Sequence, residues 1–209
     1  SEGALREGLL HDLIGRVHDE DIRDKTIMDV SHRYGVDIEQ AKRVKETAGI
    51  FFHQVSMDWD LDEKLDLKLL QWGALVHEIG LSVAHNQYHR HGAYLITYSD
   101  MAGFSRQEQI KLAKLVRSHR RTFPMEEFES IAESMRISIL RLCILLRLAV
   151  VIHRSRSYSH LPEMQIEVNR NRIDLTFPRG WLADHPLTLV DLHTESNYLQ
   201  AVDIGLTFQ

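Results

Sequence analysis

Residues 37–57 read DIEQAKRVKETAGIFFHQVSM, and this stretch decides the fold class. Asp37 and Gln40 have the spacing of a capping box, in which each side chain serves the backbone N–H of the other residue. Apolar side chains then recur every three or four residues, at Ala41, Val44, Ala48, Phe51, Phe52 and Val55. This period predicts an amphipathic helix over 37–57. Gly35, just before it, predicts the end of an earlier helix.

The same helical period extends in both directions along the chain. Apolar positions predict further helices over 4–14, 21–34, 64–80, 105–121 and 135–157. Ser105 and Glu108 form a second capping box at the start of the helix over 105–121. The segment 135–157 is apolar on most sides, so we expect its helix at the centre of a bundle.

The pattern changes after Pro162. Two runs of alternating apolar residues, separated by Asn-Arg-Asn-Arg, predict a β-hairpin. Their apolar positions are Met164, Ile166, Val168, Ile173, Leu175 and Phe177. Residues 187–202 predict one more helix, and 203–208 predict a short strand. The predicted fold is therefore mainly α, with a helical domain over 1–160 and a small α+β domain over 161–209.

The composition is that of an ordinary globular protein. The 209 residues carry 25 Lys and Arg against 30 Asp and Glu, and 44% are hydrophobic, which excludes collagen, coiled coils and disorder. Arg141 and Arg147 interrupt the longest apolar stretch, 137–152, so we predict no membrane span and expect a cytoplasmic protein. The single Cys143 excludes an internal disulfide and a cysteine zinc site, and we expect it to be buried.

Positive charge is concentrated in one segment. Residues 85–121 carry seven basic and two acidic side chains, whereas 1–84 carry 10 and 17. The same basic segment holds His85, His89, His91 and His119. A local positive field favours an anionic partner even when the net charge is negative. The alternative is an ordinary solvated helix face.

Three histidine-bearing segments follow one another: Val76-His77-Glu78-Ile79-Gly80, His89-Arg90-His91-Gly92-Ala93-Tyr94 and Val116-Arg117-Ser118-His119-Arg120-Arg121. In this order they resemble the HD phosphohydrolase superfamily, in which histidines and aspartates hold a divalent metal. Here Gln40 stands at the first histidine position, Glu78 replaces the Asp of the His-Asp pair, and Val150 stands at the closing Asp. Because valine offers a cation neither charge nor lone pair, we expect no metal. We interpret His77, Glu78 and His119 as a degenerate remnant of such a site.

A longer series of motifs runs along the chain. Its members are Ala4-Leu-Arg-Glu-Gly8, Asp21-Ile-Arg-Asp-Lys-Thr26, Arg33-Tyr34 with Val36-Asp37, Gln40-Ala-Lys-Arg-Val44, His77-Glu-Ile-Gly80, Tyr88-His-Arg-His-Gly-Ala-Tyr-Leu95, Gly103-Phe-Ser105 with Glu108-Gln109, and Leu115-Val-Arg-Ser-His-Arg120. Together they resemble the C-terminal region of the exopolyphosphatase / guanosine pentaphosphate phosphohydrolase (Ppx/GppA) family. The resemblance covers nearly the whole chain and implies a degenerate HD-like helical domain.

The resemblance also implies an N-terminal half that is absent from this sequence. In the family that half is an actin-like domain with phosphate-binding loops, an Mg²⁺ site and a catalytic Glu. The 209 residues contain no Gly-rich phosphate loop, so no catalytic residue is carried over. We therefore expect an excised fragment without a cofactor of its own, in which 1–14 form the seam to the missing half. We expect it to be inactive alone.

The basic segment supplies the candidate binding residues. Lys111, Lys114, Arg117 and Arg121 follow spacings of 3, 3 and 4, which predicts one cationic strip on the outward helix face, with Arg120 beside it. His89, Arg90 and His91 are predicted to begin the neighbouring helix, whose free N–H groups favour anions. Several cations on one face suit a polyphosphate chain. Alternatively, Arg117 and Arg121 pair with Glu126, with Glu127 or with the acidic segment 1–84.

Three functions remain open at this point. The first is an accessory region of an exopolyphosphatase-type hydrolase, which binds polyphosphate or pppGpp and forms a homodimer. The second is an autonomous HD-type metal-dependent phosphohydrolase. The third is a regulatory dimerisation module without a ligand, in which the acidic residues 1–84 meet the basic segment of a second chain. No membrane and no specific nucleic acid are expected as partners.

Overall fold

The computed structural model describes residues 21–129, 131, 133–156 and 161–209, and it is mainly helical. The helices of the first part are α2 Ile22–Arg33, α3 Ile38–Val55, α4 Leu65–Val76, η1 Ile79–Ser82 (a 3₁₀ turn), α5 Tyr88–Tyr98, α6 Arg106–Ser118, α7 Met125–Phe128 and α8 Glu133–Ile152. The last part contains β1 Gln165–Asn169, β2 Arg172–Thr176, α9 Trp181–Asp184, α10 Pro186–Gln200 and β3 Gly205–Phe208. The helix predicted over 4–14 lies outside the described residues.

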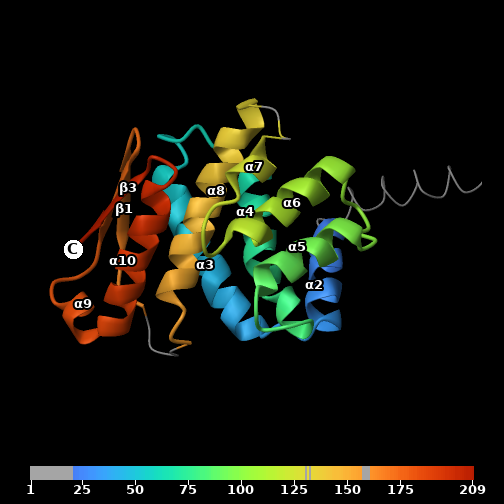
Figure 1. The fold of residues 1–209 in the computed structure, drawn as a ribbon, viewed down its shortest axis with the longest axis horizontal. Coiled ribbons are helices and arrows are strands. Elements are labelled where there is room, and N and C mark those ends of the chain that lie inside the picture. The colour runs from blue at the N-terminus through green and yellow to red at the C-terminus, as the bar shows by residue number, and fades with distance from the viewer. Residues whose placement is uncertain (1–20, 130, 132, 157–160) are drawn as a thin grey trace, which may run out of the picture.

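Helix α8 runs through the middle of the molecule, where it contacts α3, α4, α6 and α10 (Figure 1). Leu142, Cys143 and Leu146 on this helix are fully buried, which confirms both its predicted central place and the burial of the single cysteine. Phe51 and Phe52 are also buried in the same core, as their helical spacing predicted, and Trp72 of α4 is buried with them. No helix in the described part of the chain is both long and apolar enough to cross a membrane.

Side-chain caps fix the starts of several helices. Asp21 accepts a hydrogen bond from the backbone N–H of Arg23 (3.0 Å), and Ser105 and Glu108 form the reciprocal box predicted for α6. The box predicted at the start of α3 is only half formed. Asp37 accepts from the backbone N–H of Gln40 (3.0 Å), but the Gln40 amide instead donates to the carbonyl of His153 (2.7 Å).

Three helices end at least three residues earlier than the sequence predicted, and one of them, α8, ends at Ile152 rather than at 157. Helix α4 stops at Val76 rather than continuing to 80, and α6 stops at Ser118 rather than at Arg121. In both cases a histidine, His77 or His119, is the C-cap, and its ring bonds the carbonyl oxygen three residues earlier. The single-turn helices α7 and α9 were not predicted, because four residues are too short to show a helical period.

The last part of the chain forms a three-stranded sheet in the order β1-β2-β3. The predicted hairpin is confirmed as the antiparallel pair β1–β2, with Ile166 opposite Leu175. Strand β3 pairs in parallel with β2, and α9 and α10 make the connection between them. Helix α10 packs against both β3 and α8 (Figure 1). The predicted domain boundary at 160 adjoins residues outside the described part, and it stays a prediction.

Candidate functional site

The three histidine-bearing segments meet at one place in the fold. The rings of His77, at the end of α4, and His119, at the end of α6, lie 5.3 Å apart at 83°, and both residues are 1% exposed. Each Nδ1–H donates to a backbone carbonyl, that of Ala74 at 2.7 Å and that of Val116 at 2.6 Å. Since a carbonyl oxygen only accepts, Nδ1 carries a proton in each ring, and in a neutral imidazole the Nε2 is then an acceptor. Burial lowers the pKa of both imidazoles, so both stay neutral.

Gly80 explains how α5 reaches this position. A Cβ atom at Gly80 would overlap the carbonyl oxygen of Tyr88 and would lie 2.5 Å from the backbone nitrogen of Gly92. Only glycine therefore lets the start of α5 lie directly against η1. This contact brings the ring of Tyr88 to 5.4 Å and that of His89 to 6.3 Å from the ring of His119. The glycine of the His-Glu-Ile-Gly motif is thus a packing requirement.

The residues present do not fit a divalent metal. Both polar atoms of the Gln40 amide already have a partner, because its oxygen accepts from Arg43 (2.6 Å) and its nitrogen donates to a backbone carbonyl. Both oxygens of Glu78 accept from Arg156, at 2.6 and 2.8 Å. Val150 lines the same cavity with an apolar surface. Within the described residues, no three His, Cys, Asp or Glu side chains are grouped as metal ligands.

We call the cavity around these histidines the histidine pocket; it has a volume of about 320 Å³. It lies between the ends of α4, α6 and α8 and helix α10, and His77, Tyr88, His119, Val150, Asp191 and Tyr198 are among the residues that line it. Arg154 and Arg156, which follow α8, also line it, and their place was not foreseen from the sequence. Arg154 pairs with Asp191 and Arg156 pairs with Glu78. Because these partners are far apart in the sequence, no local pattern predicted the pairs.

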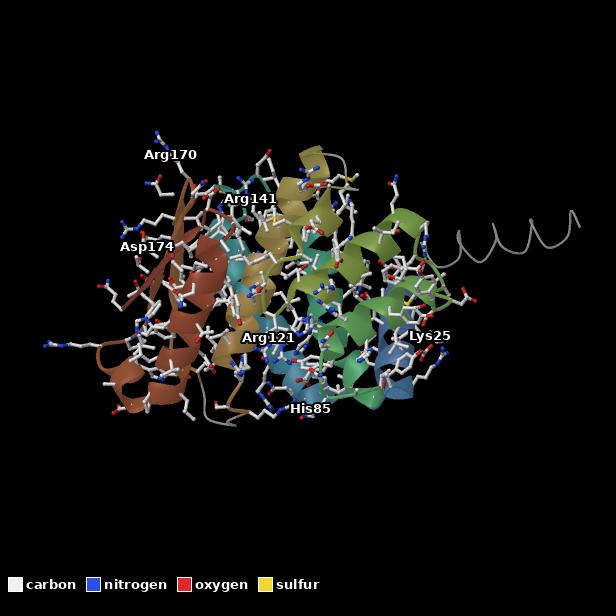
Figure 2. All side chains as sticks on the ribbon, in the orientation of Figure 1. Lys25, His85, Arg121, Arg141, Arg170 and Asp174 are labelled. Atoms are coloured by element: carbon white, nitrogen blue, oxygen red, sulfur yellow. The ribbon has the colours of Figure 1, made fainter. Side chains whose placement is uncertain are left out.

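A second cavity of about 330 Å³ opens beside the first, and we call it the arginine pocket. Its lining consists of His85, Asn86, Gln87, His89, Arg90, Arg117, Arg120, Arg121 and Thr122. None of these nine residues is acidic, so the lining carries four guanidinium groups and no carboxylate. His85, Arg120 and Arg121 line both pockets, and Figure 2 shows His85 and Arg121 near one another in the lower middle of the molecule.

The arginine pocket is electropositive. Among the described residues, Arg90, Arg120 and Arg121 have no carboxylate partner, whereas Arg117 donates to Glu127 at 3.1 Å. The Arg120 guanidinium stacks on the Tyr88 ring at 4.5 Å. Burial, together with the surrounding arginines, lowers the pKa of His89 to about 4. His89 is therefore neutral at pH 6 and adds no positive charge to the pocket.

The predicted cationic strip along α6 is wrong as a single face. The helix ends at Ser118, and Arg121 leaves it with a left-handed backbone (φ +64°). Lys111 faces a different depression, which it shares with Asp66, and Lys114 donates to the carbonyl of Glu127 at 2.6 Å. The alternative pairing with Glu127 is thus correct for Arg117. The structure instead groups the predicted residues His89, Arg90, Arg117, Arg120 and Arg121 around one pocket, without His91.

The fold and the site define a mainly α-helical domain in which buried histidines adjoin a pocket lined by arginines. The chain belongs to the Ppx/GppA phosphatase family, because the model for Ppx/GppA phosphatase, domain III, matches residues 22–196. This match confirms the family resemblance seen in the motif series.

Named relatives agree with this assignment. The chain is 35% identical over 193 residues to a guanosine-5'-triphosphate,3'-diphosphate pyrophosphatase from Aeromonas hydrophila, and the alignment covers 92% of this chain. It is 33% identical to the protein of the same name from Aeromonas salmonicida, again over 92% of this chain. The chain spans 39% of the length of these relatives.

Proposed function

We propose that this chain is an accessory domain of a Ppx/GppA-type phosphohydrolase, and that its arginine pocket binds the phosphate chain of the substrate. The substrate class is a phosphoanhydride chain, either inorganic polyphosphate or a guanosine polyphosphate. The names of the Aeromonas relatives support this class, because they are called guanosine-5'-triphosphate,3'-diphosphate pyrophosphatases. Hydrolysis itself is assigned to the part of such a protein that this chain does not span.

One observation carries the proposal: four arginines line a single pocket without any carboxylate. Buried or clustered cations are normally paired, since like charges held together cost free energy. Arg90, Arg120 and Arg121 lack such a partner in the described structure. Arginine forms forked, charge-assisted hydrogen bonds with phosphate oxygens, and these bonds are stronger than neutral ones. A multiply charged phosphate chain would supply the compensating charge.

The structure also gives the expected size of the effect. Each phosphate charge neutralised on a flexible polyanion contributes about −0.7 to the slope of log K against log salt concentration. Arg117 is left out of the sum because Glu127 already compensates it. The three remaining arginines give a slope of about −2.1, so raising NaCl from 50 to 200 mM should weaken binding roughly 18-fold.

The experiment compares two variants with the same change of net charge. Arg120→Gln/Arg121→Gln removes two cations from the pocket, whereas Lys25→Gln/Arg179→Gln removes two exposed cations elsewhere. Figure 2 shows Lys25 at the opposite end of the helical part from the sheet. Affinity for long-chain polyphosphate is measured by isothermal titration calorimetry at four salt concentrations, and circular dichroism checks that each variant is folded.

We expect the pocket variant to bind more weakly and to lose only about threefold between 50 and 200 mM NaCl, because one unpaired arginine remains. The control variant should keep the wild-type slope. Equal weakening in both variants would refute a localised site and would mean that net charge alone governs binding. The homodimer expected from the sequence is a separate proposal, which light scattering over the same salt series tests.

A further inference from the structure

His89 is the deeply buried histidine of the arginine pocket. It is 5% exposed, and its Nδ1 has no hydrogen-bond partner among the described residues. His85, which also lines this pocket, is exposed. A buried polar atom without a partner lowers stability, so a ligand that supplies the partner is favoured there. His89 is therefore the histidine whose surroundings change most when the pocket is filled.

Positive charge surrounds the His89 imidazole. Four guanidinium groups act on it: Arg90 on α5, Arg117 on α6, and Arg120 and Arg121 on the turn that follows α6. Of these, only Arg117 has a carboxylate partner in the described structure, Glu127. The neighbouring rings of Tyr88 and His119 are neutral, since burial raises the pKa of the phenol and lowers that of the imidazole. The 3₁₀ turn η1, which also packs against α5, contains no ionisable side chain.

The position of His89 in its helix adds to this positive potential. His89 is the second residue of α5, and the N-cap residue Gln87 makes no side-chain hydrogen bond that caps the helix. The first backbone N–H groups of a helix carry partial positive charge, so a cation is disfavoured among them. Burial is the largest cause that lowers the pKa of His89 to about 4, and the four arginines act in the same direction. The empty pocket therefore holds a neutral ring.

We infer that His89 takes up a proton when a phosphate chain enters the arginine pocket, and that it thereby becomes a further cationic residue of this binding site. This inference rests on the function proposed above and adds its regulation by pH. The neutral ring already carries one proton, and the second proton comes from the solvent and binds the other ring nitrogen. An imidazolium ion donates from both nitrogens and forms charge-assisted hydrogen bonds with phosphate oxygens.

A bound phosphate chain removes the causes that keep this ring neutral. Its negative charges compensate Arg90, Arg120 and Arg121, and an anion within a few ångströms favours the charged form of the imidazole. The pKa of His89 in the complex should therefore rise toward the ordinary value of about 6.5. A group whose pKa is higher in the complex makes binding tighter as the pH falls below that pKa, by up to tenfold for each unit of the rise. The arginines stay charged throughout and cannot supply this dependence.

The test counts protons during the binding of long-chain polyphosphate to the 209-residue chain. Almost all phosphates of this probe are internal, so few of them gain or lose a proton near pH 6, as a terminal phosphate does. Isothermal titration calorimetry at pH 5 and at pH 7, in buffers of different ionisation enthalpy, gives both the affinity and the number of protons taken up. The variants are His89→Gln, which keeps a donor and an acceptor without a titratable ring, and His85→Gln in the same lining. The control is His53→Gln on α3, where the side chain is exposed.

A rise of the His89 pKa to about 6 in the complex gives an uptake of about 0.8 proton per chain at pH 5, and an affinity about tenfold higher at pH 5 than at pH 7. His89→Gln should lose most of the uptake and of the pH dependence, whereas His53→Gln should keep both. Binding by the wild type without proton uptake, or an uptake lost in His85→Gln but kept in His89→Gln, would overturn the inference and leave the phosphate site intact. Failure of the wild type to bind polyphosphate at either pH would overturn the proposed function as well.

Discussion

Arg147 is the side chain through which the core of the molecule holds the arginine pocket in place. It lies on α8, fully buried, and binds both oxygens of Glu195 on α10. Its third nitrogen donates to the carbonyl of Ser118 at 2.6 Å, and its guanidinium lies 4.3 Å from the centre of the Phe123 ring. Arg147 therefore holds both ends of the turn over 119–122, which carries Arg120 and Arg121.

The perturbation is Arg147→Met, which keeps an unbranched apolar stem but removes the guanidinium group and its charge. It leaves Glu195 buried without a partner, and breaking a buried ion pair in this way costs about 3–5 kcal/mol. For a chain of this size 1 kcal/mol corresponds to about 2–4 °C in Tm, so Tm should fall by roughly 6–20 °C. The double variant Arg147→Met/Glu195→Leu buries no unpaired charge and should regain most of that loss.

Tm and the affinity for tripolyphosphate should respond differently to these two variants. Tripolyphosphate affinity should fall about threefold or more in the single variant, and it should stay low in the double variant, because neither can hold the Ser118 carbonyl. Thermal denaturation followed by circular dichroism gives Tm, and calorimetry below the transition gives the affinity.

Arg141→Met is the matched control on the same helix. Arg141 also donates to a backbone carbonyl, that of Trp59 at 2.6 Å, but it has no carboxylate partner in the described structure. Arg141→Met should lower the free energy of unfolding by about 1 kcal/mol and leave the affinity for tripolyphosphate unchanged. If Arg147→Met lowered Tm as little as this control, or if the double variant recovered wild-type affinity together with Tm, Arg147 would not hold the arginine pocket in place.

Three further outcomes are expected. Gly80→Ala should destabilise the fold by about 3 kcal/mol in urea denaturation, because the new Cβ would overlap the carbonyl oxygen of Tyr88. The control Gly49→Ala on α3 has open space around its Cβ and should stabilise the fold by up to about 1 kcal/mol. Similar effects of the two variants would contradict the close packing of η1 and α5. Acidification should lower Tm between about pH 6.5 and 4. Burial lowers the pKa of both His89 and His153 to about 4, so in this range the unfolded chain binds more protons than the folded chain. A Tm that does not change over this pH range would show that these histidines are not held in the neutral form by burial. Elemental analysis of protein purified without chelator should find no stoichiometric Mn, Fe or Zn. One tightly bound ion per chain that is lost in His77→Ala would contradict the conclusion that the residues around His77 do not fit a divalent metal.

The elements that the sequence predicted best are those defined by local physics. Helices α2 and α6 begin where Asp21 and Ser105 cap them, and α3 follows the apolar period that runs to Val55. The hairpin β1–β2 follows from alternation on both sides of a polar turn. Each of these signals depends on residues within four positions of one another, so a single sequence contains it completely.

The features of the fold and the site that could not be predicted from the sequence depend on contacts between residues far apart in the chain. The end of α6 at Ser118 removes Arg121 from the helix face, and no local breaker such as glycine marks that end. Glu78 is neutralised by Arg156 and Glu195 by Arg147, pairs that only the tertiary fold brings together. The residues of the arginine pocket were largely identified from charge, but their grouping required α5 to lie against η1.

The most direct test of the central claim is an NMR titration of the arginine side chains with inorganic tripolyphosphate. Each guanidinium gives its own Nε–Hε signal, which shifts when the group binds an anion. We expect the signals of Arg90, Arg120 and Arg121 to shift together and to saturate at one phosphate chain per protein. The signals of Arg170 and Arg179, on the sheet side, should not move. Shifts that spread evenly over all exposed arginines without saturating would contradict the account, because they would show a diffuse surface charge in place of a phosphate-binding pocket.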